Sequence, residues 1–155
     1  MSRVFFISDL HLSHKNMALR RGFKDETEHD NRIIESWNKV VNKRDTVWIL
    51  GDISMEKTAP YHLLSKLNGI KNVVLGNHDQ PQHVPELLKY VNKVCGCIQY
   101  KGYMLSHIPI HESELTRFKG NVHGHVHEKS LPDKRYINVS CEVIDYTPKL
   151  LSELL

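Results

Sequence analysis

Residues 4–11 read VFFISDLH, four apolar strand formers followed at once by polar side chains. A buried strand is therefore predicted to end at Ser8-Asp9, where polar chemistry begins. The same pattern recurs at residues 46–52 (TVWILGD) and at residues 73–79 (VVLGNHD). In an α/β fold the carboxyl ends of the strands lie at one edge of the sheet, so these polar residues are expected to share a site.

Helices are expected between these strands, and further strands dominate the second half of the chain. Apolar residues from Ile33 to Val41 recur with helical spacing, which predicts a helix starting near Thr27. Shorter helices are predicted at residues 61–67, 85–91 and 148–155, and strands at residues 94–100, 103–106, 121–123 and 136–141. This order of elements predicts an α/β sandwich rather than one doubly wound sheet, in a single domain of residues 1–155.

The composition is that of an ordinary globular protein, with 40% hydrophobic and 25% charged residues. The net charge of +3 carries no basic run, so it neither requires nor excludes a nucleic-acid partner. The three cysteines suggest no disulfide framework. The first apolar run is too short for a signal peptide and no stretch is long enough to cross a membrane, so a cytoplasmic protein is expected.

Metal-capable side chains follow strand after strand along the chain. They are Asp9, His11, Asp52, Asn77, His78, Asp79, His107, His125 and His127. Any one of them alone is commonly a turn residue or a core histidine, but their recurrence at successive strand ends indicates a common site. A mixed set of oxygen and nitrogen ligands suits manganese, iron, zinc or nickel better than calcium or magnesium. A shared carboxylate can hold two such ions about 3.5–4 Å apart.

The blocks DLH (9–11), GD (51–52), GNHD (76–79), SH (106–107) and GHVH (124–127) resemble, in order and spacing, the signature of the calcineurin-like metallophosphoesterases. Further stretches resemble a small bacterial and phage branch of that family that lacks a cap domain. Those stretches are residues 9–16, 21–25, 36–40, 138–142 and 145–148. The resemblance therefore covers nearly the whole chain. It implies a four-layer type of α/β sandwich, in which two mixed β-sheets are flanked by helices.

The resemblance also implies a role for each residue of the blocks. The first metal would be held by Asp9, His11 and His127, and the second by Asn77, His107 and His125. Asp52 would bridge the two ions, His78 would act as general acid, and Asp79 would orient His78 through a hydrogen bond. Two divalent transition-metal ions are expected, with manganese the most effective in vitro.

Four further residues are weaker candidates for the site. Substrate contacts are considered for His14, Arg21 and His111, each of which could equally be a loop or surface residue. His123 precedes the GHVH block and is expected in the core or behind the ligands.

The expected reaction is hydrolysis of a phosphodiester or phosphomonoester, with diesters favoured and a small nucleotide-like substrate. A hydroxide shared by the two ions would attack phosphorus while His78 protonates the leaving oxygen. One alternative is a nuclease or nucleic-acid end-processing enzyme, although no basic stripe with interleaved aromatic residues supports it. Another is a non-catalytic scaffold with the same fold, and a protein phosphatase is only weakly indicated. A homodimer formed through a strand edge remains open.

Overall fold

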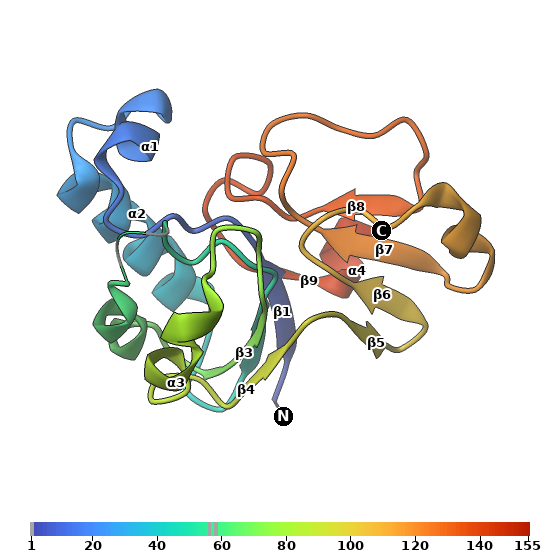
Figure 1. The fold of residues 1–155 in the computed structure, drawn as a ribbon, viewed down its shortest axis with the longest axis horizontal. Helices are drawn as coiled ribbons and strands as arrows, with labels where there is room; N and C mark the ends of the chain where they lie inside the picture. The colour runs from blue at the N-terminus through green and yellow to red at the C-terminus, as the bar shows by residue number, and fades with distance from the viewer. Residues whose placement is uncertain (1, 56, 58) are drawn as a thin grey trace.

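Two β-sheets form the centre of the protein, whose computed structural model describes residues 2–55, 57 and 59–155 (Figure 1). The first sheet contains β1 (Val4–Ile7), β2 (Thr46–Ile49), β3 (Ile70–Val74), β4 (Lys93–Cys95) and β9 (Lys149–Leu150), in the order β4-β3-β2-β1-β9. The second contains β5 (Ile98–Tyr100), β6 (Tyr103–Leu105), β7 (Gly120–His123) and β8 (Tyr136–Asn138), in the order β5-β6-β7-β8.

Both sheets are mixed. Strands β1 to β4 are parallel, and β9 pairs antiparallel with β1. In the second sheet β6, β7 and β8 are parallel, whereas β5 is antiparallel to β6. This confirms the expected α/β fold of two mixed sheets flanked by helices, and it brings the ends of β1, β2 and β3 to one edge.

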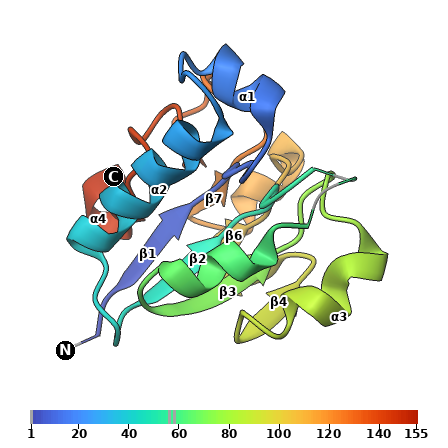
Figure 2. The same ribbon diagram turned by 90° about the vertical axis from the view of Figure 1, so that its left-hand side faces the viewer.

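The helices are short apart from one. They are α1 (Lys15–Arg20), α2 (Glu26–Val40), α3 (Val84–Leu87) and α4 (Leu151–Leu154), with 3₁₀ helices at Tyr61–Lys66, Pro81–His83 and Glu112–Thr116. Helices α2 and α3 lie on the side of the first sheet that faces away from the second sheet (Figures 1 and 2). Among the residues described, no helix combines the length and apolar character needed to span a bilayer.

Helix α2 forms because its ends and its buried face are both well specified. The Asp25 side chain caps the first turn by accepting a hydrogen bond from the Glu28 amide at 2.8 Å. Ile33 and Trp37, four residues apart, lie on one helical face and are fully buried. The indole of Trp37 also donates a hydrogen bond to the Asn68 carbonyl at 2.8 Å, which ties the helix to the loop before β3.

The two sheets pack on each other and then join through the main chain. Phe6 of β1 meets Tyr100 of β5 edge to face, with ring centroids 5.7 Å apart. Just beyond β1, the Ser8 amide donates to the Val139 carbonyl at 2.9 Å, and the Val139 amide donates to the His123 carbonyl at 2.8 Å. Residues 139–141 thus connect the end of β1 with the end of β7.

Several element boundaries differ from those expected from sequence. The expected strand over residues 94–100 is two strands, because residues 93–95 pair with β3 and residues 98–100 pair with β6. Residues 61–66 form a 3₁₀ helix, and residues 148–155 begin with strand β9 before α4. Helix α1 was not expected. Local apolar patterns do not reveal which partner a short strand will find, so pairing decided the strands at residues 93–100 and 149–150.

Replacing Trp37 by alanine should lower the free energy of unfolding by about 3–5 kcal/mol, because a fully buried indole leaves a cavity and an unpaired carbonyl. Urea denaturation followed by circular dichroism measures this. Glu35→Ala, on the exposed face of the same helix, is the control and should stay within about 0.5 kcal/mol of the wild type. Equal stability of the two variants would contradict the packing described for α2.

Candidate metal centre

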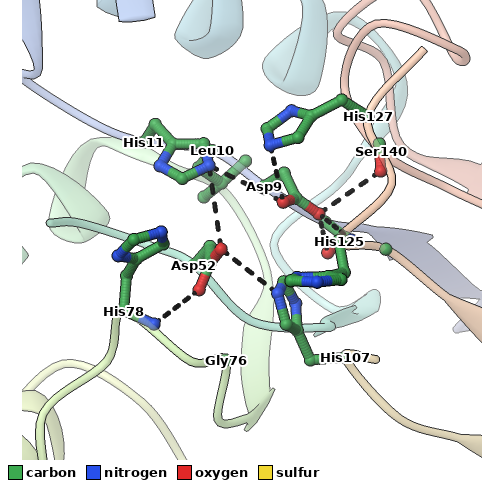
Figure 3. Close-up of polar contacts among 12 residues, drawn as sticks. Asp9, Leu10, His11, Asp52, Gly76, His78, His107, His125, His127 and Ser140 are labelled. Carbon is green, nitrogen blue, oxygen red and sulfur yellow. Dashed lines mark hydrogen bonds and ion pairs between the residues drawn. The ribbon is translucent and has the colours of Figure 1, made fainter. Parts of the chain in front are cut away.

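Two groups of side chains come together at the carboxyl edge of the sheets (Figure 3). One group contains Asp9, His11 and His127, and the other contains Asp52, His107 and His125. Within each group the candidate ligand atoms all lie within 4.8 Å of one another. The loops after β1 and β2 run side by side, because Asp9 and His11 donate main-chain hydrogen bonds to Gly51 and Asp52, both at 3.0 Å.

Asp52 lies between the two groups. Its Oδ2 is 3.1 Å from His107 Nε2 and 3.8 Å from His11 Nε2, whereas its Oδ1 accepts a hydrogen bond from the His78 amide at 3.0 Å. One carboxylate oxygen therefore faces a histidine of each group (Figure 3). This is the geometry required of a ligand shared between two ions.

The two oxygens of Asp9 have different surroundings. Oδ2 lies 2.6 Å from Ser8 Oγ and 3.3 Å from Ser140 Oγ, and it accepts from the His125 amide at 2.9 Å. Oδ1 is buried without a hydrogen-bond partner in the part of the chain that is described, and it lies 3.6 Å from the Nε2 atoms of His11 and His127. Hydrogen bonds thus hold Asp9 Oδ2 in place, whereas Asp9 Oδ1 is left to bind a cation.

The residues present fit a divalent metal. Within the described ranges, Asp9 Oδ1, His11 Nε2 and His107 Nε2 are buried polar atoms that make no hydrogen bond. Such atoms are costly unless something pairs with them, and here they point toward one another from both sides of Asp52. Carboxylate oxygen and imidazole nitrogen together suit the transition metals. A divalent cation in each group would satisfy all three atoms.

The protonation of these groups also suits metal binding. Burial acts to raise the pKa of Asp9, but the neighbouring histidines and the Ser8 hydroxyl outweigh it and hold the pKa below its usual value. Burial lowers the pKa of His11, which favours the neutral ring that a metal needs. Burial likewise acts to lower the pKa of His107, but the adjacent Asp52 carboxylate outweighs it and raises that pKa. A cation bound here would take the place of a proton on His107.

The backbone at the site adopts an uncommon conformation. Five of the candidate ligands have left-handed φ values: Asp9 (60°), His11 (47°), Asp52 (54°), His125 (72°) and His127 (54°). Aspartate and histidine tolerate this region better than most residues do, yet it remains strained, and such residues cluster at functional sites. The sharp turns aim successive side chains of one loop toward the same point.

Two glycines allow the loops to approach each other. A Cβ atom at Gly124 would overlap Ser8 Oγ and Asp9 Oδ2, and one at Gly76 would overlap the Asp52 side chain. Only a residue without a side chain fits at either position. The glycines of the GNHD and GHVH blocks therefore serve to bring the turns after β3 and β7 against the two aspartates.

Asn77, His78 and Asp79 lie on the turn after β3. Asn77 Oδ1 is 3.1 Å from His125 Nδ1, which places the amide beside the second group. The His78 ring lies near that of His11, with centroids 5.9 Å apart. The Asp79 carboxylate accepts hydrogen bonds from three amides, those of Asp52 (2.8 Å), Ile53 (3.1 Å) and Gly76 (2.8 Å). Its described contacts therefore hold the two turns together.

Arg21 does not lie where a phosphate clamp would, which corrects one expectation. Its side chain is 1% exposed, and its guanidinium donates to the carbonyls of Asp9 (2.6 Å) and Leu10 (3.2 Å) and to Glu142 (3.1 Å). Every side of the group is thus engaged inside the protein. Glu142 in turn lies 2.8 Å from His127 Nδ1, a contact that the sequence alone did not suggest although residues 138–142 stood out as a block.

The remaining candidates are His14, His111 and His123. The ring of His14 caps α1 by accepting from the Met17 amide at 3.1 Å, and the ring of His111 caps the 3₁₀ helix that follows it. His111 is exposed and lines a hollow together with Leu131 and Pro132. His123 is fully buried behind the site, as expected for a core residue. Substrate contacts by His14 and by His111 both stay predictions.

Fold and site together define a class: an α/β protein of two mixed sheets with two candidate metal-binding groups of carboxylates and histidines. The chain belongs to the calcineurin-like phosphoesterase family, whose model matches residues 2–154. Proteins of this family typically bind divalent metals, in line with the two groups described above. Membership supports metal-dependent phosphoesterase activity.

Similar proteins span much of the chain. The "Uncharacterized protein MJ1445" of Methanocaldococcus jannaschii is 35% identical over 96% of this chain and 86% of its own length. The "Gene 66 protein" of Mycobacterium phage L5 is 45% identical over 52% of this chain and 42% of its own length. Among solved structures, the protein of unknown function AQ665 from Aquifex aeolicus matches 99% of this chain and 97% of its own, with 26% identity and a TM-score of 0.77.

Manganese should stabilise the protein if it binds only the folded state. At about 100 times its dissociation constant, Mn²⁺ raises the free energy of unfolding by about 2.7 kcal/mol per site. In a domain of this size that shifts Tm upward by about 5–11 °C. Differential scanning fluorimetry with Mn²⁺, and again after EDTA, measures the shift. An identical Tm in both conditions would count against a metal centre.

Gly124→Ala should weaken metal binding by at least about 10-fold, because the new methyl group displaces Ser8 and Asp9. Calorimetric titration with Mn²⁺ measures the affinity. Gly96→Ala is the matched control, since a Cβ there meets no atom within 4 Å and the affinity should stay unchanged. If both alanine variants bind Mn²⁺ like the wild type, the close approach at Gly124 has no role in the site.

Proposed function

We propose that this protein is a two-metal hydrolase that cleaves phosphodiester or phosphomonoester bonds, with diesters favoured, in small nucleotide-like substrates. The observation that carries the proposal is the position of Asp52 Oδ2, which faces His11 on one side and His107 on the other. A shared carboxylate flanked by two ligand groups is the arrangement by which proteins hold a metal pair. The family supports the reaction class, and the substrate preference is our inference.

The proposed metals are two divalent transition-metal ions, with manganese the most effective in vitro and iron, zinc or nickel as alternatives. Bound in the two groups, they would activate a water and neutralise the charge that develops on the phosphoryl oxygens. Asp9, His11 and His127 would hold one ion, and Asn77, His107 and His125 the other. Asp52 would be shared.

His78 would act as the general acid. It is half-buried, and its ring lies beside that of His11 at the edge of the metal centre. Its amide donates to Asp52 Oδ1 at 3.0 Å, which fixes its main chain relative to the shared carboxylate. A ring in this place would give a proton to the departing oxygen of the ester.

Asp79 would support the turns beside His78 as well as orient the His78 ring. Its carboxylate joins the amides of Asp52, Ile53 and Gly76, and so ties the turn after β2 to the turn that carries His78. Burial, only partly offset by these hydrogen bonds, raises the pKa of Asp79 to about 6. The contacts described for Asp79 therefore support the main chain beneath His78, and the hydrogen bond to the His78 ring stays a prediction.

His78→Ala should lower kcat on bis-p-nitrophenyl phosphate with Mn²⁺ by about 10²–10⁴-fold, the usual contribution of a positioned acid, while metal binding is kept. Release of p-nitrophenol measures the rate, and calorimetry measures the metal. His62→Ala, an exposed histidine on the 3₁₀ helix Tyr61–Lys66, is the control and should behave like the wild type.

The same assay with p-nitrophenyl phosphate separates diester from monoester preference. Faster turnover of the monoester would redirect the search toward nucleotide and sugar phosphates. Unchanged kcat in His78→Ala would remove His78 from the mechanism, and metal-dependent hydrolysis that survives Asp52→Asn would remove the shared carboxylate.

A further inference from the structure

The Nδ1 atom of each histidine in the two ligand groups has a described neighbour, and that neighbour differs from one histidine to the next. The partners of Nδ1 are Met55 Sδ at 3.3 Å for His11, the Leu50 carbonyl at 2.7 Å for His107, Asn77 Oδ1 at 3.1 Å for His125, and Glu142 Oε2 at 2.8 Å for His127. Of these four partners, Glu142 is the one that carries a charge. His127 therefore differs from the other three histidines in having a charged partner at Nδ1.

The contact with Glu142 fixes which nitrogen of His127 can bind a metal. A carboxylate only accepts hydrogen bonds, so His127 Nδ1 must carry the proton and donate it. The lone pair of the neutral ring is then on Nε2, the atom that lies 3.6 Å from Asp9 Oδ1 at the centre. A carboxylate on the far side of a histidine also makes the ring a stronger ligand.

Arg21 fixes Glu142 in turn. Its Nε donates to the same Glu142 Oε2 at 3.1 Å, and its other nitrogens donate to the carbonyls of Asp9 and Leu10. The guanidinium therefore holds the carboxylate that supports one ligand, His127, and the main chain that carries another, Asp9. Asp9 and His127 are 118 positions apart in sequence. The ion pair of Arg21 and Glu142 connects them.

Helix α2 fixes Arg21. An arginine has donors only, so His29 Nε2 accepts from Arg21 at 2.8 Å, and His29 Nδ1 must then donate to Asp30 Oδ1 at 2.9 Å. Asp30 also accepts from the Ser13 amide at 2.9 Å and from the Ser13 hydroxyl at 2.9 Å. Because each donor in this series has a defined acceptor, the network admits one arrangement of protons.

We propose that Glu142, held in place by Arg21, is a positioning residue that directs Nε2 of His127 at the first metal and strengthens binding there. The inference rests on the proposed metal centre and adds a determinant of its affinity. A plain structural ion pair would affect both metal positions alike through the stability of the fold. A positioning residue affects the binding of the first metal ion, and it does so through His127.

The test is titration of metal-free protein with Mn²⁺ by calorimetry. Wild type should bind two equivalents, and in Glu142→Gln one of the two affinities should fall by about 10–100-fold, the usual loss when such a partner of a metal ligand is removed. The other affinity should stay unchanged. Glu128→Gln is the matched control, because Glu128 adjoins His127 in sequence but is 59% exposed and contacts only Arg20 among the ion pairs described.

A double-mutant cycle shows whether Glu142 acts through His127. His127→Ala combined with Glu142→Gln should bind Mn²⁺ no more weakly than His127→Ala alone, because the interaction has already been lost. Additive losses would overturn the proposal. Glu142→Asp, which keeps the charge but is one methylene shorter, should show the same selective loss if Glu142→Gln does not fold.

Three outcomes distinguish the possible failures. Unchanged affinities in both Glu142 variants, with two equivalents bound to the wild type, would overturn the role of Glu142 alone. Equal weakening of both positions together with a lower Tm of the metal-free protein would also overturn it, in favour of a structural ion pair. A wild type that binds no metal would overturn the proposed function and this inference together.

Discussion

The carboxylate of Asp9 is the interaction on which the rest of the structure depends, because it joins the two sheets at the site. One of its oxygens accepts from the His125 amide and lies beside the hydroxyls of Ser8 and Ser140, so it binds the end of β1 to the turns after β7 and β8. Its other oxygen faces His11 and His127. The Asp9 side chain therefore connects the two sheets through one oxygen and offers the other oxygen as a candidate ligand. Its contacts also hold the left-handed backbone at these turns.

The burial of two carboxylates explains why the site would bind cations. Asp9 and Asp52 are almost fully buried, and burying an ionised carboxylate is costly unless it is paired. The surrounding amides, hydroxyls and imidazoles hold the pKa of both below the usual value, although burial acts in the opposite direction. Two negative groups with imidazole nitrogens between them strongly attract divalent ions. The hydrogen bond from Arg21 to the Asp9 carbonyl holds the main chain of Asp9 without placing a positive charge among the ligand atoms.

Strands β1, β2 and β3 of the first sheet were predictable, because each is a short run of strand-forming residues that ends in a polar turn. Val4–Ile7 was placed correctly, and Thr46–Ile49 begins where the pattern over residues 46–52 begins. The strand at residues 70–74 begins three residues earlier than expected, since the half-polar start Ile70-Lys71-Asn72 pairs with β2. The division of residues 94–100 between two sheets could not be predicted, because both halves carry the same local pattern and differ only in the strand they meet.

The sequence by itself determined the family, the identity of the candidate ligands and their place at strand ends, because metal ligation demands particular side chains and parallel strands end together. It did not determine which oxygen of Asp9 or Asp52 faces the centre, nor that Arg21 is buried behind the ligands rather than open to substrate. It also gave no role to Glu142, 15 residues after His127. Only the tertiary structure decided these points, because each depends on atoms that become neighbours after the two sheets have packed and residues 139–141 have joined them.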